Sequence, residues 1–341
     1  MIIESANFKL KLEEFQKGHT FSPSNETEEK VFWLVKQWVN NVKSFDFLTS
    51  GSTGKPKKVR ISRDKIIYST RATFKAIDPK NVFKRTLLCL DPGFIGGAMV
   101  VFRALIQHLD LYIIEPTSNI TAAIPPDFNV DLVSIVPMQY KHLQPKDFEK
   151  LGTILVGGGA LEEQMVHDEL SPNVYATYGM TETVSHIALR KVQNKSYSTV
   201  GDVEVDLCSE ETLMFKGEIT DHKWLKTNDI GVVNSKHSFE WIGRRDFVIN
   251  TGGIKVNPEA IEKKLDEQIS SLFMVSFIPD AQLGQKVVLL LAGTKPSTLD
   301  FGKLEKYETP KIVFEEQAIF QTASGKIDRI KTQRQLLESL Q

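Results

Sequence analysis

The sequence predicts an α/β protein with a large N-terminal domain, in which sheets are flanked by helices, and a small α+β C-terminal domain. The length of 341 residues suggests two domains, at about 100–200 residues per domain. Up to about residue 177, continuous apolar strand patterns alternate with amphipathic helical patterns, which favours a covered and largely parallel sheet. Near residue 246 the pattern changes, so we expect domains over residues 1–245 and 246–341.

The N-terminal region begins with a helical pattern. Apolar residues recur at helical spacing from Val31 to Val42, and Asn25 is a candidate N-cap. Further helices are expected over residues 62–74, 96–109 and 161–170. Short apolar runs predict strands over residues 45–48, 86–90, 111–114, 131–136, 153–156 and 174–177. Ligands of such sheets bind where strands end, so the loops after these strands are the first candidates for a site.

The rest of the chain reads as short strands and one well-marked helix. Strands with turns between them are expected over residues 212–215 and 230–233. Asn257 and Pro258 occupy the N-cap and N1 places that these residue types prefer, so a helix should run from there to about residue 269. Strands are expected over residues 273–278, 287–291 and 312–314.

The composition is ordinary for a globular protein and gives no sign of a nucleic-acid or membrane partner. Net charge is −1 and charged residues make up 25% of the chain, so no global field favours polyanions. The two cysteines, Cys89 and Cys208, form no metal or redox pattern. The first ten residues do not resemble a signal peptide, and no apolar run approaches the ~20 residues that span a bilayer. We expect a cytoplasmic enzyme without membrane insertion, and its oligomeric state stays open.

A loop rich in glycine, hydroxyl and lysine residues follows the strand at residues 45–48. It reads TSGSTGKPKK over residues 49–58, and such loops bring backbone N–H groups, hydroxyls and cations to phosphates. It is not a Walker A loop, because only two residues separate Gly51 from Gly54 and Pro56 follows Lys55. By itself, a flexible basic surface loop is an equal alternative. The candidate phosphate-binding residues are Ser50, Gly51, Ser52, Thr53, Gly54 and Lys55.

Two more loops leave predicted strands. The run Gly157, Gly158, Gly159 and Ala160 admits close approach of a flat ligand, or is simply a tight turn. The run YGMTET follows at residues 178–183. Its Tyr178 could stack on a base or belong to the core. Its Glu182, beside Thr181, could hold Mg²⁺ together with phosphate oxygens, or be a carboxylate at a helix start.

Three candidates lie further along the chain. Asp229 could accept hydrogen bonds from ribose hydroxyls and Arg244 could donate to them, although for either residue alone a surface turn with an ion pair is the better explanation. Near the end, the run TASGKIDR at residues 322–329 presents Lys326 from a glycine turn. Alone, this would be a solvated basic turn.

Taken together, six segments resemble the adenylate-forming superfamily of acyl-CoA synthetases, peptide-synthetase adenylation domains and luciferases. They are TSGSTGKPKK (49–58), GGGA (157–160), YGMTET (178–183), LKTND (225–229), IGRRDFVINTGGIKVNPEAIE (242–262) and TASGKIDR (322–329), in the order of the family. The runs SIVPMQ (134–139) and GMTETVS (179–185) are most similar to the branch that ligates o-succinylbenzoate to coenzyme A in menaquinone biosynthesis. The resemblance implies a truncated adenylate-forming fold, with fewer than fifty residues before the lysine loop.

The resemblance also implies an AMP-forming acyl-CoA ligase that uses ATP, Mg²⁺ and coenzyme A on a small-molecule carboxylate. The loop at residues 50–55 would hold the β- and γ-phosphates, Thr181 the α-phosphate and Glu182 the Mg²⁺. Lys326 would bridge the attacking carboxylate and the α-phosphate. The adenine would lie against Tyr178, Gly179 and residues 157–160, and Asp229 with Arg244 would hold the ribose.

Lys326 lies far from the lysine loop along the chain, so the implied chemistry requires a mobile C-terminal domain that closes. Asp246 would be its hinge, and Gly252 and Gly253 would face coenzyme A. Candidates for the acyl pocket are Phe94, Gln139, Thr183, Ser185 and His186. Other possibilities are another acyl- or aryl-CoA synthetase, a free-standing adenylation domain, or a catalytically dead nucleotide-binding regulator.

Overall fold

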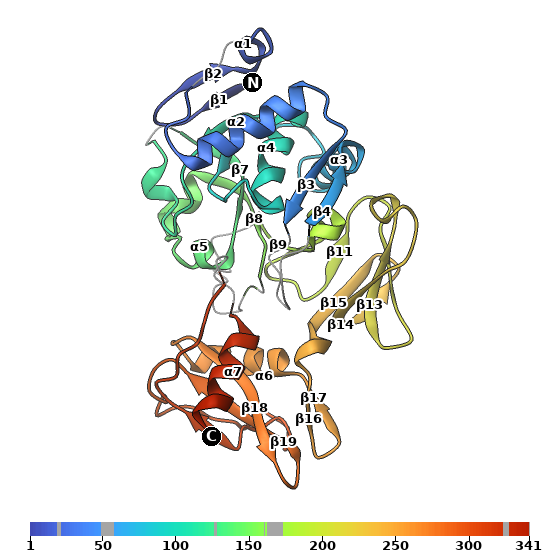
Figure 1. The fold of residues 1–341 in the computed structure, drawn as a ribbon, viewed down its shortest axis with the longest axis vertical. Helices are drawn as coiled ribbons and strands as arrows, with labels where there is room; N and C mark the ends of the chain where they lie inside the picture. The colour runs from blue at the N-terminus through green and yellow to red at the C-terminus, as the bar shows by residue number, and fades with distance from the viewer. Residues whose placement is uncertain are drawn as a thin grey trace. The chain divides into compact units, whose positions relative to one another are not determined.

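The computed structural model describes residues 1–18, 22–48, 58–125, 128–159, 161, 173–322 and 327–340 (Figure 1). They form two compact units. The first is built from residues up to Leu161, residues 173–204 and Phe215–Trp224, and the second from Val205–Met214 and the chain from Leu225 onward. The predicted helix at residues 161–170 falls almost wholly outside the described residues. The C-terminal domain that we expect to begin at Asp246 and to move as a body stays a prediction.

The first unit is organised by a sheet with the strand order β2-β1-β6-β5-β7-β8-β9-β10-β11. Neighbours from β1 to β9 in this order are parallel, and the remaining pairs are antiparallel. The predicted parallel core is therefore confirmed, whereas the first two strands were not foreseen. The strands are β1 (Ile2–Glu4), β2 (Lys9–Lys11), β5 (Arg85–Leu88), β6 (Asp110–Ile113), β7 (Val130–Ile135), β8 (Leu151–Val156), β9 (Val174–Gly179), β10 (His186–Lys191) and β11 (Tyr197–Thr199).

The helix α4 (Ile95–Gln107) is the centre of this unit's core, and it confirms the helix expected at residues 96–109. Every residue from Gly97 to Leu105 is buried, as expected of a helix that is apolar on nearly all sides. It packs against α2 (Glu26–Val39), α3 (Arg63–Ile77) and strands β5, β6 and β7. The predicted cap of α2 is confirmed, because Asn25 Oδ1 accepts from the Glu28 N–H at 2.9 Å. The short helices α1 (Leu12–Gln16) and α5 (Pro137–Lys141) complete the unit's α-helices among the described residues.

The strand predicted at residues 45–48 exists, but it belongs to a hairpin of its own and not to an edge of the large sheet. β3 (Ser44–Leu48) pairs antiparallel with β4 (Lys58–Ser62), and the register places Leu48 opposite Lys58. The lysine loop between these residues lies outside the described part of the chain. Its two ends are therefore fixed by a ladder that the sequence pattern did not indicate.

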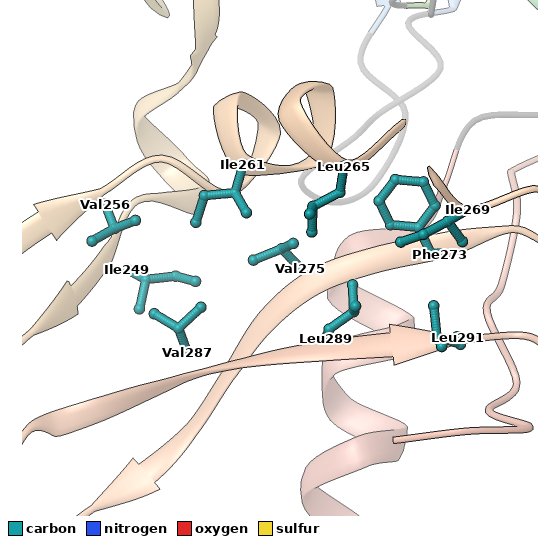
Figure 2. Packing of buried hydrophobic residues seen from close by; sticks show 10 residues of the cluster. All are labelled: Ile249, Val256, Ile261, Leu265, Ile269, Phe273, Val275, Val287, Leu289 and Leu291. Atoms are coloured by element: carbon teal, nitrogen blue, oxygen red, sulfur yellow. The ribbon is translucent and has the colours of Figure 1, made fainter. Parts of the chain in front are cut away.

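The second unit has a small sheet covered by a helix on each face. β18 (Phe273–Asp280) and β19 (Gly284–Leu291) are antiparallel, and β20 (Ile312–Phe314) runs parallel to β19. Alternate residues face opposite sides of a strand. One side packs on α6 (Pro258–Leu265) and the other on Leu336 of α7 (Arg329–Ser339). Figure 2 shows the α6 side, formed by Ile249, Val256, Ile261, Leu265, Ile269, Phe273, Val275, Val287, Leu289 and Leu291.

Further strands complete the description. β16 (Ile249–Thr251) and β17 (Ile254–Val256) form a hairpin beside β19. A ribbon in the order β12-β13-β14-β15 comprises β12 (Glu204–Leu207), β13 (Thr212–Lys216), β14 (Leu225–Ser235) and β15 (Ser238–Arg244). Within the described residues, no helix combines the length and apolar character needed to cross a bilayer.

Candidate functional site

The carboxyl ends of β5, β7, β8 and β9 lie at one edge of the first unit's sheet, because these strands are parallel neighbours. The loops that leave them contain, or lead directly into, the first unit's predicted site residues that the structure describes. Ligands bind at such an edge in α/β sheets. The residues gathered there are Phe94, Gln139, Gly157, Gly158, Gly159, Tyr178, Gly179, Thr181, Glu182, Thr183, Ser185 and His186.

The glycines after β8 are required by their surroundings. A Cβ on Gly157 would lie 2.3 Å from Thr177 Oγ1. The Gly157 N–H donates to the Ile135 carbonyl at 2.9 Å. Gly158 has a φ of +81°, a conformation that side chains disfavour. The tight-turn interpretation therefore has direct support, and the approach of a ligand to these glycines stays a prediction.

The loop after β9 is shaped by Gly179 and Thr183. A Cβ on Gly179 would lie 2.0 Å from the Ser185 carbonyl oxygen, so the two ends of the loop touch. The buried Thr183 hydroxyl lies 2.9 Å from that same oxygen and 3.0 Å from the Met180 carbonyl, and it accepts from the Met180 N–H at 3.0 Å. Thr183 thus closes the loop, and its hydroxyl is already engaged.

The loop that Thr183 closes leaves Thr181 and Glu182 accessible. Thr181 is half-buried and Glu182 is exposed on the short 3₁₀ turn Thr181–Thr183. Among the described residues no group of three or more His, Cys, Asp or Glu could hold a metal ion by itself. A single exposed carboxylate fits Mg²⁺, which commonly takes one or two protein carboxylates and completes its shell with phosphate oxygens and water.

Tyr178 packs in an aromatic cluster. Its ring centroid lies 5.3 Å from that of Phe215 and 6.0 Å from that of Tyr197, and the residue is half-buried. One part of the ring therefore belongs to the core. A half-buried ring held by two others is a rigid surface on which a base could stack.

Gln139 forms hydrogen bonds with the segments that follow the three strands β5, β6 and β7. Its Nε2 donates to the carbonyls of Cys89 at 3.0 Å and Thr117 at 2.9 Å, while its Oε1 accepts from the Val136 N–H at 3.0 Å. The residue is 3% exposed. The structure thus gives Gln139 a positioning part at the site edge, and a direct part in acyl binding stays a prediction. Phe94, by contrast, is exposed at the start of α4.

His186 is buried between α3 and α4, and its hydrogen bonds fix one neutral tautomer. Thr73 Oγ1 donates to the Ser69 carbonyl at 2.9 Å, so it must accept from His186 Nε2, which lies 2.8 Å away. His186 Nδ1 then faces Arg103 Nη2 at 3.4 Å. Burial, and to a smaller extent the Arg103 charge, lower the pKa of His186 well below its ordinary value.

The sequence analysis did not single out Arg103 as a site residue. It is buried in α4, and no carboxylate pairs with it among the described residues, where its Nε has no hydrogen-bond partner. Burial lowers the pKa of Arg103 to about 10. The available signal was a lone cation in an otherwise apolar helix.

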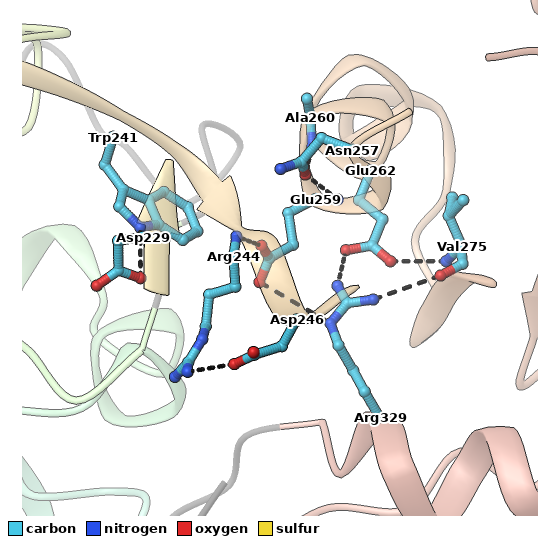
Figure 3. A network of polar contacts seen from close by, with 10 residues as sticks. All are labelled: Asp229, Trp241, Arg244, Asp246, Asn257, Glu259, Ala260, Glu262, Val275 and Arg329. Atoms are coloured by element: carbon cyan, nitrogen blue, oxygen red, sulfur yellow. Dashed lines mark hydrogen bonds and ion pairs between the residues drawn. The ribbon is translucent and has the colours of Figure 1, made fainter. Parts of the chain in front are cut away.

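The second unit holds the remaining described candidates (Figure 3). Asp229 on β14 and Arg244 on β15 face each other in the ladder register. Asp229 Oδ1 accepts from Trp241 Nε1 at 3.2 Å, while the Arg244 guanidinium donates to Asp246 at 2.7 Å. Asn228 Nδ2 also donates to Asp246, at 3.3 Å. The two expected ribose-binding residues are thus neighbours, and the expected hinge carboxylate pairs with one of them.

Gly252 and Gly253 form the two-residue turn between β16 and β17, with φ of +62° and +82°. Two consecutive residues at positive φ are typical of a tight hairpin turn, which explains both glycines without a ligand. Their expected contact with coenzyme A stays a prediction. Ser50, Gly51, Ser52, Thr53, Gly54, Lys55, Ala160 and Lys326 lie outside the described residues.

Glu259 is a second residue that the sequence analysis did not single out. It lies in the first turn of α6, and its side chain is largely buried beside Arg329 and the backbone of Arg244. Burial raises the pKa of Glu259 to about 7, against the opposing effects of Arg329 and the Arg244 N–H. Glutamate in a first helical turn is common, so the sequence alone carried no signal.

Comparison with known proteins defines the class to which this arrangement belongs. Residues 22–217, more than half of the chain, match the AMP-binding enzyme family. The chain therefore belongs to that family, and its relatives place it among adenylate-forming acyl-CoA ligases.

Particular relatives are more specific. A 2-succinylbenzoate–CoA ligase of Listeria monocytogenes is 26% identical over 355 residues, which cover 92% of this chain and 74% of that protein. An AMP-forming acyl-CoA synthetase-like protein from Dyadobacter fermentans has 30% identity and a TM-score of 0.60, covering 94% of this chain and 97% of that one. The o-succinylbenzoate–CoA synthetase of Bacillus subtilis, solved with its acyl-adenylate, has 21% identity and a TM-score of 0.72, covering 85% of this chain and 68% of that one. The last shows likeness of fold alone.

Proposed function

We propose that this protein activates o-succinylbenzoate as its acyl-adenylate and transfers the acyl group to coenzyme A, as a step of menaquinone biosynthesis. The observation that carries the proposal is the gathering of Tyr178, Thr181 and Glu182 with the glycine loop at one sheet edge. The name of the Listeria relative supports this choice of acid.

The reaction would proceed in two steps that balance. A carboxylate oxygen attacks the α-phosphorus of ATP, the bond to the bridging oxygen breaks, and acyl-AMP and pyrophosphate result. The sulfur of coenzyme A then attacks the acyl carbon, its proton leaves to solvent, and AMP departs with the electron pair. A free carboxylate does not react with a thiol, because oxide is a very poor leaving group. The first step removes this obstacle, because AMP is a far better leaving group.

The protein's contribution to the first step would be charge stabilisation and orientation. Negative charge accumulates at the α-phosphate, so positioned donors and cations lower the barrier. Thr181 would donate to the α-phosphate and Lys326 would neutralise the forming bond. Bound Mg²⁺, held by Glu182, would neutralise phosphate charge. Tyr178 would stack on the adenine, and Asp229 with Arg244 would hold the ribose.

The second step would use a different arrangement of the same chain. The C-terminal domain would move about Asp246 once pyrophosphate has left, so that Lys326 no longer faces the reacting atoms. The hairpin at Gly252 and Gly253 would then border the pantetheine. Small residues at that turn permit close approach of a thin substrate.

A screen of carboxylic acids tests the assigned acid. Pyrophosphate and AMP release would be measured with o-succinylbenzoate, benzoate, fatty acids and amino acids, with and without coenzyme A. We expect AMP release that depends on both o-succinylbenzoate and coenzyme A. A fatty-acid preference would favour the alternative that a partial match points to, since a putative long-chain fatty acid–CoA ligase of Staphylococcus aureus is 28% identical over 153 residues. Inactivity with every acid would favour a nucleotide-binding regulator.

Lys326→Ala tests the assigned catalyst. We expect carboxylate-dependent pyrophosphate exchange to fall by roughly 100-fold or more, because a cation aimed at developing charge is lost. Lys303→Ala is the control, since Lys303 is an exposed surface lysine that pairs with Glu267 at 3.1 Å. Exchange that survives the first substitution would remove Lys326 from the adenylation step.

A further inference from the structure

Glu259 contacts two segments that are far apart in sequence (Figure 3). One carboxyl oxygen, Oε2, accepts from the backbone N–H of Arg244, the last residue of β15. The other, Oε1, lies 3.9 Å from Arg329 Nε at the start of α7. A single side chain thus joins the strand that bears the expected ribose arginine to the segment that follows Lys326.

The contact with β15 is tight. A Cβ on Gly243 would lie 2.5 Å from Asn257 Nδ2 and 2.6 Å from Glu259 Oε2, so β15 rests directly on the first turn of α6. That turn is itself fixed, because Asn257 Oδ1 accepts from the N–H groups of Glu259 at 2.9 Å and Ala260 at 3.1 Å. The Glu259 carboxyl therefore has little freedom to move away.

Arg329 is held from several sides. Its guanidinium pairs with Glu262 and donates to the Val275 carbonyl at 3.4 Å. It also lies 5.3 Å from the ring centroid of Phe247, which is 5.9 Å from the Arg244 guanidinium. Arg329 comes three residues after Lys326.

The charges around Glu259 make its protonation state sensitive to pH. Arg329 of α7 is the cation beside Glu259, and Arg244 of β15 contributes its backbone N–H, while Glu262 of α6 and Asp229 of β14 are the nearby carboxylates. Two largely buried carboxyls share the single Arg329 guanidinium, so its one positive charge cannot neutralise both. Burial outweighs the effect of Arg329 and raises the pKa of Glu259 to about 7 and that of Glu262 above its ordinary value.

We propose that Glu259 is a positioning residue, whose ionised carboxyl holds the Arg244 end of β15 and the Arg329 segment in one arrangement. The inference deepens the proposed function, because it matters for catalysis only if Arg244 and Lys326 act on ATP. It predicts that activity rises with pH as Glu259 ionises.

The contribution of Glu259 to folding stability should fall as pH rises, which is opposite to the expected change in activity. A carboxyl whose pKa is raised by folding favours the folded state most when it is protonated. This contribution is complete below the ordinary value of 4.5 and is lost as pH rises through about 7. Glu259 therefore destabilises the fold at the pH where it positions Arg244 and Arg329. A residue with a merely structural part would raise stability and activity together.

The test compares Glu259→Gln with the wild-type protein at about pH 6 and about pH 8, on either side of the pKa of about 7. The glutamine keeps the shape and can accept from the Arg244 N–H, but it cannot ionise. Hydrogen exchange of the Arg244 amide, corrected for intrinsic pH dependence, needs no substrate. We expect wild-type protection to be greater at the higher pH by roughly tenfold, and this difference to disappear in the variant.

Activity is the second readout. Between about pH 6 and about pH 8, we expect kcat for adenylation to rise in the wild type by a factor roughly tenfold larger than in Glu259→Gln. At about pH 8, the variant should be at least as stable as the wild type. Glu267→Gln, which removes an exposed carboxylate of the same unit, should match the wild type throughout.

Each outcome is decisive. Equal exchange and equal pH profiles in the wild type and Glu259→Gln would overturn the proposal. The expected exchange pattern, combined with no activity on any acid, would support the positioning contact and reject the proposed function. If Glu259→Gln does not fold, Arg329→Lys, which keeps the charge but loses the fork of donors, should still reduce Arg244 amide protection. Unchanged protection in that variant would also overturn the proposal.

Discussion

At the scale of single residues, the site edge of the first unit depends on buried polar groups that never reach the ligand. Gln139 fixes three strand ends, and Thr183 closes the loop that presents Thr181 and Glu182. Such groups are stable when buried only because each donor and acceptor has a partner. Arg103 departs from this pattern, because its only hydrogen-bond partner among the described residues is the neutral His186.

Replacing Arg103 by methionine should stabilise the protein. The substitution removes a buried charge that no described carboxylate pairs with and keeps most of the apolar volume, so we expect the free energy of unfolding to rise by about 1–4 kcal/mol. Arg71→Met, at an exposed position of α3, should change it by less than about 0.5 kcal/mol. Urea denaturation measures both. A lower stability of Arg103→Met would mean that an anion compensates Arg103 in solution.

At the scale of elements, β-strand ends and helix starts place the site, and glycines let them approach. The chain of β9 touches that of β10 at Gly179, where the Ser185 oxygen occupies the space a side chain would need. In the second unit, β15 meets the start of α6 at Gly243, where the nearest atoms belong to the side chains of Asn257 and Glu259. The contact at Gly179 brings one backbone against another, so it cannot relax by moving a flexible side chain.

Gly179→Ala should therefore destabilise the protein, whereas Gly96 should tolerate the same change. Forcing the loop open should cost about 1–3 kcal/mol and lower adenylation activity, because Thr181 and Glu182 shift with it. Gly96→Ala in α4 is the matched control, since its nearest neighbour would lie 3.9 Å away. Alanine there should be neutral or stabilise the helix by up to about 1 kcal/mol. Similar losses in both variants would show that the contact at Gly179 is unimportant.

At the scale of the whole molecule, the proposed reaction needs both units. The first holds the candidates for adenine, α-phosphate and metal, and the second holds those for ribose together with the segment before Arg329. Each unit has its own buried core. The hinge that we expect at Asp246 lies within the second unit, so this division into units does not mark it and the hinge stays a prediction.

A double-mutant cycle on Lys55 and Lys326 tests whether the two units act on one nucleotide. If both lysines contact the same triphosphate, their effects on kcat/KM for ATP should be non-additive by at least about 0.5 kcal/mol. Lys55→Ala combined with Lys303→Ala should be additive, because Lys303 is an exposed lysine that pairs with Glu267. Additive effects in the first pair would mean that the lysines do not share a ligand.

The sequence by itself determined what depends on near neighbours in the chain. Apolar spacing marked α4 and the strands β18 and β19, and Asn25 and Asn257 marked helix starts, because caps and periodicity are local properties. The order of six motifs likewise identified the family, since a motif is read along the chain.

Only the tertiary structure decided which residues support the site. The partners Arg103 and His186 are 83 positions apart, and Glu262 and Arg329 are 67 apart. Side chains so distant in sequence meet only after strands pair and helices pack, and burial then changes the pKa of His186 and Glu259. The same long-range packing placed β4 opposite β3 and left Arg103 with no carboxylate partner in the part of the chain that the structure describes, which no local pattern could indicate.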